Sequence, residues 1–306
     1  MKKTAKRLFD RVSPRQQHNW DGRAATNFIA GGAGGGLLLL TAVAGLDANA
    51  ARAAILTGLV LIASGLTCVW FEIGRPWRAL NVYRHFATSW MTREAVAALF
   101  LFPIGGLALL TGRTLFVALA GILGLAFLYC QARMLAANKG IPTWRHQRSV
   151  PLMVSTGLAE GAGFLAAVSA ILSPAPSVWV LAGLIAALVV RAFFWKTYLV
   201  GLVAEGAPEG ALRVLLGIDR RIVIIGHSLP LLAIVAVLVG MPGRVVLVLA
   251  AGILAVAGGW FLKYALSRRA AFTQGLALPR LPVRGGGPPG PAAKPGWRFA
   301  PGAKAG

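Results

Sequence analysis

The sequence has few acidic residues, and few charged residues of either sign for its length. Charged residues make up 13% of the 306 residues, whereas soluble domains contain roughly 25%. Nine Asp and Glu residues stand against 31 Lys and Arg, a formal net charge of +22. The basic residues are spread between apolar runs and over both end segments, which favours membrane loops, so we expect no nucleic-acid partner.

Cysteine is equally scarce. Cys68 and Cys130 are the two cysteines, and each lies inside an apolar run. An iron–sulfur or zinc site takes about four sulfur or nitrogen ligands, so we expect no metal site in this chain. The sequence also has neither a phosphate-binding Walker motif nor an HExxH motif.

Long apolar runs are abundant. The chain is 57% hydrophobic with a mean hydropathy of +0.70, and a membrane-spanning helix needs about 20 mostly apolar residues. Eight stretches qualify: Thr26–Leu46, Arg52–Phe71, Ala95–Leu110, Thr114–Met134, Pro151–Leu172, Val178–Phe194, Ile222–Gly240 and Val245–Leu266. The sequence therefore predicts an all-α, polytopic membrane helix bundle with eight transmembrane helices.

The basic residues between these stretches indicate the topology. When the basic residues near the ends of the stretches (Arg52, Arg133, Arg191 and Lys263) are counted with the neighbouring segment, alternate segments contain seven, four, four, five and eight Lys or Arg, and the segments between them contain one, one, none and one. Basic loops stay in the cytoplasm, so both termini are predicted to be cytoplasmic. Three regions follow: a basic cytoplasmic segment over 1–25, the eight-helix domain over 26–270, and a Pro/Gly-rich basic tail over 271–306 that we expect to be disordered and cytoplasmic.

Two carboxylates are predicted at the cytoplasmic boundary, Glu72 at the end of the second helix and Glu94 at the start of the third. An antiparallel hairpin would place them at one depth in a shared pocket, with the aromatic and basic segment 74–86 as a short interfacial helix between them. A partly buried carboxylate suits proton exchange with a quinone. The alternative is that both acids pair with Arg75 and Arg93 at helix ends.

Other ionisable residues lie further inside the predicted spans. Glu160 is surrounded by glycines, which predicts that it faces protein, either on a proton path or in a structural hydrogen bond. His227 has no second histidine at membrane depth, so we expect no haem. Lys263, near the end of the last span, is expected to extend to the membrane interface.

Gly74-Arg75-Pro76 followed by Ser89-Trp90-Met91-Thr92-Arg93-Glu94 resembles the membrane-anchor subunit of the DMSO reductase family. The resemblance implies a haem-free, eight-helix anchor in the bacterial inner (cytoplasmic) membrane. Such an anchor exchanges electrons between the quinone pool and an iron–sulfur subunit, which carries a molybdopterin catalytic subunit. The iron–sulfur clusters and molybdopterin would then belong to partners on the cytoplasmic face, and the chain would have no catalysis of its own.

The resemblance also assigns site residues. The family's quinol-site Glu falls on Glu94, and its quinol-site His falls on Glu72, a departure from the family pattern. The glycine-rich opening of the first helix is similar to related polysulfide- and nitrite-reductase anchors, which adds Asn27. The residues expected to bind quinone are Arg75, Trp77, Trp90, Arg93 and Asn27.

Other interpretations stay open at this stage. The segment Gln17–Ala25 resembles anchors of phenylacetyl-CoA:acceptor oxidoreductases, which implies a role in phenylacetyl-CoA oxidation. A secondary transporter of the inner membrane would need inverted repeats and charges at mid-membrane. A purely structural tether would make Glu72 and Glu94 expendable.

Overall fold

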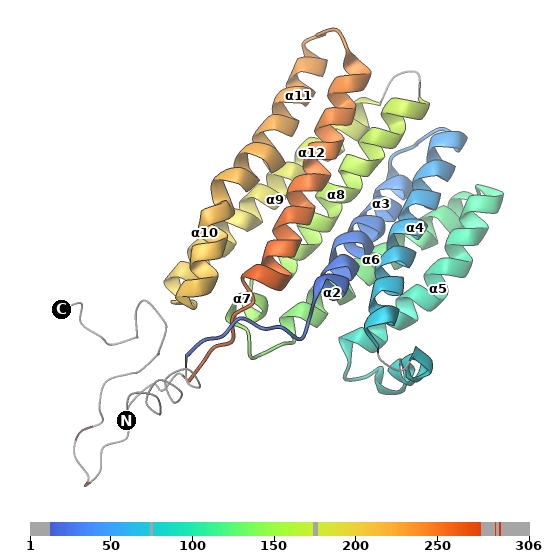
Figure 1. The fold of residues 1–306 in the computed structure, drawn as a ribbon. Coiled ribbons are helices and arrows are strands. Elements are labelled where there is room, and N and C mark those ends of the chain that lie inside the picture. Colours follow the sequence, from blue (N-terminus) through green and yellow to red (C-terminus); the bar gives the residue numbers. More distant parts are fainter. Residues whose placement is uncertain (1–12, 74–75, 174–176, 277–284, 286–287, 289–306) are drawn as a thin grey trace.

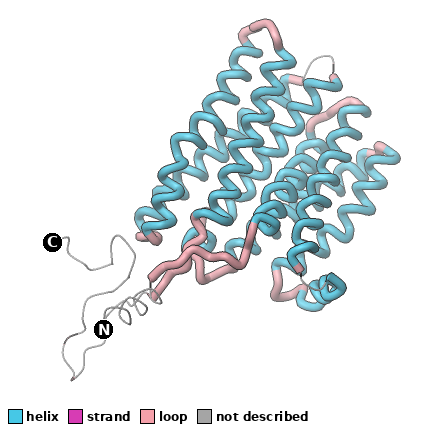
Figure 2. Tube along the Cα trace, in the orientation of Figure 1, coloured by secondary structure: helices cyan, strands magenta, loops and turns pink. Residues whose placement is uncertain are grey.

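The computed structural model describes residues 13–73, 76–173, 177–276, 285 and 288, except for the side chains of 76–79. Helices make up most of this part of the chain, and the loops gather at the two ends of the bundle (Figure 2). The elements are α2 (Gly22–Thr26), η1 (Asn27–Gly31), α3 (Gly32–Val43), α4 (Ala48–Glu72), η2 (Pro76–His85), α5 (Trp90–Thr111), α6 (Thr114–Ala136), α7 (Pro142–Arg145), α8 (Ser149–Leu172), α9 (Val178–Ala204), α10 (Glu209–Val223), η3 (Ile224–Ser228), α11 (Leu229–Leu238), α12 (Arg244–Tyr264) and η4 (Ala265–Arg269).

Eight helices in the described residues are long and apolar enough to cross a membrane, as predicted. The first, seventh and eighth spans are composite, because π-helical turns interrupt the first at η1 and the seventh at η3, and the eighth ends in η4. The segment predicted as a short interfacial helix is the 3₁₀ helix η2.

Two predicted helix ends are wrong. The sixth helix continues past Phe194 to Ala204, and the seventh begins at Glu209 rather than Ile222. The added residues of α10 are amphipathic, with Leu215 and Ile218 buried and basic residues on the other face. A hydropathy window averages the two faces and therefore misses this part of the helix.

The bundle is organised around α3 and α8. These elements belong to the two spans with the largest buried share, and α3 packs against α4, α6 and α8 (Figure 1). Glycines make the close packing possible. A Cβ at Gly35 would lie 2.5 Å from the carbonyl oxygen of Gly124, and one at Gly36 would collide with the carbonyl of Gly157. The glycine run of the first helix thus lets neighbouring backbones approach closely.

The segments before the first span and after the last span lie together at one end of the bundle. Gln16 and Phe272 form an isolated antiparallel bridge, and Gln17 N donates to Ala271 O at 2.8 Å. Ala271 is fully buried. Residues 271–274, the first residues of the predicted tail, are thus hydrogen-bonded to the rest of the protein. Residues 277–284, 286–287 and 289–306 lie outside the described part.

Candidate functional site

Glu94 is buried near the end of the bundle that carries the terminal segments. Ser89 caps α5, its side chain accepting from Thr92 N at 3.3 Å, which places Glu94 in the second turn of the helix. The Glu94 side chain faces the first span, where Asn27 Nδ2 donates to Glu94 Oε1 at 3.0 Å. Both residues are at most 4% exposed. Asn27 and Glu94, which were predicted separately as site residues, therefore meet in the protein interior.

A cavity of about 450 Å³ adjoins this pair. Asn27, Glu94 and Ala98 are buried residues of its wall, whereas Trp70, Leu80 and Tyr83 are exposed residues of its wall on α4 and η2. The remaining lining residues are Ala63, Leu66, Thr67, Val69, Ile73, Val82, Met91, Ala95 and Phe102. The cavity therefore joins a buried carboxylate and amide to the outer apolar surface of α4 and η2, which faces lipid in a membrane-spanning bundle.

A smaller cavity of about 220 Å³ shares Asn27 and Glu94 with the first and also includes Glu72 and Trp20. The predicted shared pocket for the two carboxylates is thus present. Glu72 is partly exposed at the end of α4. Glu94 consequently borders both cavities, with apolar walls on one side and a second acid on the other.

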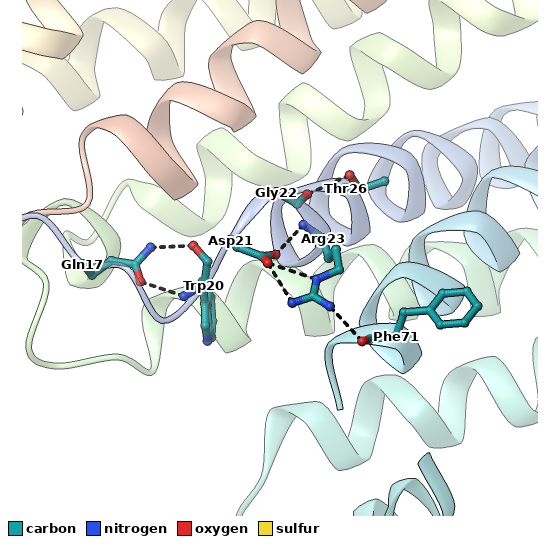
Figure 3. A network of polar contacts seen from close by, with 7 residues as sticks. All are labelled: Gln17, Trp20, Asp21, Gly22, Arg23, Thr26 and Phe71. Carbon is teal, nitrogen blue, oxygen red and sulfur yellow. Dashed lines mark hydrogen bonds and ion pairs between the residues drawn. The ribbon is translucent and has the colours of Figure 1, made fainter. Parts of the chain in front are cut away.

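Figure 3 shows how the start of the first span is fixed beside this pocket. Asp21 caps α2 by accepting from Arg23 N at 2.7 Å, and Arg23 Nη1 donates to the carbonyl of Phe71 at the end of α4, at 2.8 Å. The hydrogen bond from the Arg23 side chain lowers the pKa of Asp21. Trp20 stacks on Trp144, with ring centroids 4.8 Å apart. These contacts hold η1, and therefore Asn27, against α4.

The other predicted quinone-binding residues lie elsewhere. The guanidinium of Arg93 lies 4.2 Å from the centre of the Trp90 ring and donates to the carbonyls of Phe86 and Ala87. Neither Trp90 nor Arg93 belongs to the described walls of the two cavities. Both instead brace the loop that enters α5. Arg75 and the side chain of Trp77 lie outside the described residues.

The expectation that Lys263 extends to the membrane interface is wrong. Lys263 is fully buried rather than extended to the interface, and its Nζ donates to Glu160 Oε2 at 2.5 Å. If Lys263 extended to the membrane surface, the buried carboxylate of Glu160 would have no compensating charge, which is costly. The ammonium group therefore pairs with this carboxylate across the helix interface. Glu160 is therefore one half of an ion pair between α8 and α12.

Two further polar residues were not anticipated from the sequence. Arg191 was counted with a loop but is fully buried within α9, where it donates to the carbonyls of Ala255 and Gly226 and to His227 Nε2. Gln131 in α6 is 1% exposed and donates from Nε2 to Asn27 O at 2.8 Å. Both residues could have been found from the sequence, because each is a polar side chain inside an apolar run, and such residues are often functional in membrane proteins.

Known proteins resemble parts of the chain, and the match to one family covers the region that contains Asn27 and Glu94. A family model described as DMSO reductase anchor subunit (DmsC) matches residues 27–241. A sulfite dehydrogenase subunit from Allochromatium vinosum is 30% identical over 134 residues, which cover 38% of this chain and 41% of that relative. The chain thus matches less than half the length of the relative. Because the family match covers most of the chain, the chain belongs to the DMSO reductase anchor subunit family.

Proposed function

We propose that the chain is the haem-free membrane anchor and quinone-reactive subunit of a molybdoenzyme complex in the bacterial inner membrane. The observation that carries the proposal is the cavity of about 450 Å³ that connects the lipid-facing surface to the buried pair Asn27 and Glu94. Its apolar walls fit a prenylated ring that arrives from the bilayer, and its polar floor fits the ring oxygens.

The residues of the chain have distinct roles in this proposal. A bound quinone or quinol supplies an exchange of two electrons and two protons. Glu94 gives or takes a proton at its carboxylate, and Asn27 orients that carboxylate through its amide. Glu72 borders the smaller cavity at the end of α4 and provides a second acid on the way to the surface.

The electron-transfer partner is an iron–sulfur subunit that carries a molybdopterin catalytic subunit, as implied by the anchor family. We place both partners at the end of the bundle that contains Glu94 and the paired terminal segments. The distribution of basic residues indicates that this end is cytoplasmic.

Two resemblances suggest different substrates for the catalytic partner. The segment Gln17–Ala25 favours phenylacetyl-CoA, whereas the name of the relative in Allochromatium vinosum favours sulfite. Reduction of the purified complex by each substrate separately, followed through the iron–sulfur absorbance, distinguishes them.

Glu94→Gln tests the quinone role, because glutamine keeps the shape of the side chain and an acceptor for Asn27 but removes the exchangeable proton. We expect quinol- or quinone-dependent turnover of the intact complex to fall by about 10²–10⁴-fold, the usual effect of losing an acid–base group. Activity with an artificial dye and binding of the soluble subunits should be unchanged. Glu209→Gln, the same change at an exposed helix end, is the control. Normal quinone turnover in Glu94→Gln would exclude this role.

A secondary transporter is the second candidate, because Glu160, Arg191 and Lys263 are charged side chains buried in the bundle. Gentle detergent purification separates the two functions. An anchor co-purifies with iron–sulfur and molybdenum-containing subunits, whereas a transporter is isolated alone and moves its solute after reconstitution.

A further inference from the structure

A row of buried polar groups leads from Glu94 into the second half of the bundle. Asn27 Nδ2 donates to Glu94, and Gln131 Nε2 donates to the backbone carbonyl of Asn27. Gln131 Oε1 and Lys263 Nζ both lie beside Gly32, since a Cβ there would meet them at 3.3 and 2.5 Å. The row therefore passes from α5 through η1 and α6 to α12.

The row ends at the Glu160–Lys263 pair, both of whose side chains are 0% exposed. Three acceptors along it have no hydrogen-bond partner within the protein: Asn27 Oδ1, Gln131 Oε1 and Glu160 Oε1. Buried acceptors are normally paired, and small groups of polar atoms in an interior are usually satisfied by ordered water. Each of these three acceptors is therefore a candidate site for an ordered water molecule.

We propose that this row conducts protons and that the Glu160–Lys263 pair holds the proton that leaves Glu94. This inference rests on the proposed function, which supplies the proton at Glu94. In the transfer, the O–H bond of the Glu94 carboxyl group breaks and a new O–H bond forms at Glu160 Oε1. Each intervening water molecule accepts one proton and donates another, so a single proton is displaced and no oxidant or reductant is needed. The reverse transfer supplies the proton to Glu94 during quinone reduction.

Lys263 keeps a hydrogen-bond acceptor in both protonation states of Glu160. Its ammonium faces Glu160 Oε2 while that carboxylate is ionised. When Glu160 accepts the proton, Gln131 Oε1 beside Gly32 is the nearby acceptor for the same ammonium group. The lysine thus has a partner in both states without losing its own proton.

The local helix geometry supports the same assignment. Asn27 begins the π-helical turn η1, and the π-helical turn η4 begins two residues after Lys263. Single π-helical turns within α-helices occur frequently at functional sites. Glycine provides space in the middle of the row and at its end, since a Cβ at Gly31 would lie 2.6 Å from Gln131 Nε2 and one at Gly259 would collide with Glu160 Oε1.

The test uses the intact complex with its soluble subunits, reconstituted in lipid nanodiscs. Gln131→Met interrupts the row, and the double variant Glu160→Gln/Lys263→Met removes its end without leaving an unpaired buried charge. Thr156→Val is the matched control, because the buried Thr156 hydroxyl donates within its own helix, to Leu152 O, one turn from Glu160. Each complex is assayed for quinone-dependent turnover, dye-linked activity and reaction-induced infrared difference spectra.

We expect the wild-type and Thr156→Val spectra to show the C=O band of a protonated carboxyl group at Glu160. Both row variants should lack this Glu160 band. Quinone-dependent turnover should fall about tenfold in the row variants, less than the loss of a group that transfers the proton directly, with dye-linked activity unchanged. A wild-type band and wild-type turnover in both row variants would overturn the inference. If those variants behave as wild type while Glu94→Gln is impaired, proton conduction along the row is excluded and the proposed quinone role of Glu94 stands. If Glu94→Gln turns over quinone normally, the proposed function itself is excluded.

Discussion

Replacing Lys263 by methionine removes the cation that faces the buried carboxylate of Glu160. Both side chains are 0% exposed, and the pair is joined by a 2.5 Å hydrogen bond between α12 and α8. Removing one member of a buried ion pair costs about 3–5 kcal/mol, because the remaining charge is left without compensation. At roughly 2 °C per kcal/mol for a chain of this size, the melting temperature should fall by about 6–10 °C.

The double variant Glu160→Gln/Lys263→Met should recover most of this loss, since replacing a buried ion pair by neutral groups of similar volume is often neutral or stabilising. Thermal unfolding of the purified chain in one detergent, followed by tryptophan fluorescence, gives the four corners of a double-mutant cycle. Additive effects of the two single substitutions would refute the interpretation, because they would show that the two charges do not interact. Lys196→Met, at the more exposed pair with Asp219, provides a control expected to lose less than about 1 kcal/mol.

Three further substitutions test packing and protonation. Gly36→Ala should destabilise the bundle by about 1–3 kcal/mol, because the methyl group would collide with the carbonyl of Gly157, whereas Gly106→Ala has no heavy atom within 4 Å of its Cβ and should be neutral or stabilising in the same melting assay. Burial lowers the pKa of His146 from 6.5, so the unfolded chain binds more protons as the pH falls. Stability should therefore be retained above about pH 6.5 and decrease below it, and His146→Gln should flatten that part of the profile; an unchanged profile would exclude His146 as the cause.

The number of membrane-spanning helices could be predicted from the sequence because each span is a long apolar run and the loop charges alternate. The extensions of α9 and α10 could not, because they depend on an amphipathic pattern and on tertiary partners. Lys196 on α9 pairs with Asp219 on α10, and Trp195 Nε1 donates to the same carboxylate. These contacts make charged residues part of the helix rather than part of a loop.

The site was predictable in part for a related reason. Glu94 and Asn27 were chosen from motifs near helix starts, and the structure brings them into contact. The position of Lys263 near the end of a span favours extension to the interface, and its position opposite Glu160 reverses that preference. Nothing in a single sequence specifies which residues of α8 and α12 face each other, so the pairing of Glu160 with Lys263 can be recognised only from the structure.

The buried charges connect the two halves of the bundle. Among the described residues, the buried carboxylates are Glu94 and Glu160, and the buried Lys and Arg side chains are Arg191 and Lys263. If both acids are ionised, these four groups are neutral together; a proton on Glu94 leaves one positive charge in excess. Uncompensated charge inside a membrane protein is unfavourable, so protonation of Glu94 favours any rearrangement that spreads the excess charge. The buried polar row Asn27–Gln131–Lys263 is the route along which we propose that this rearrangement occurs.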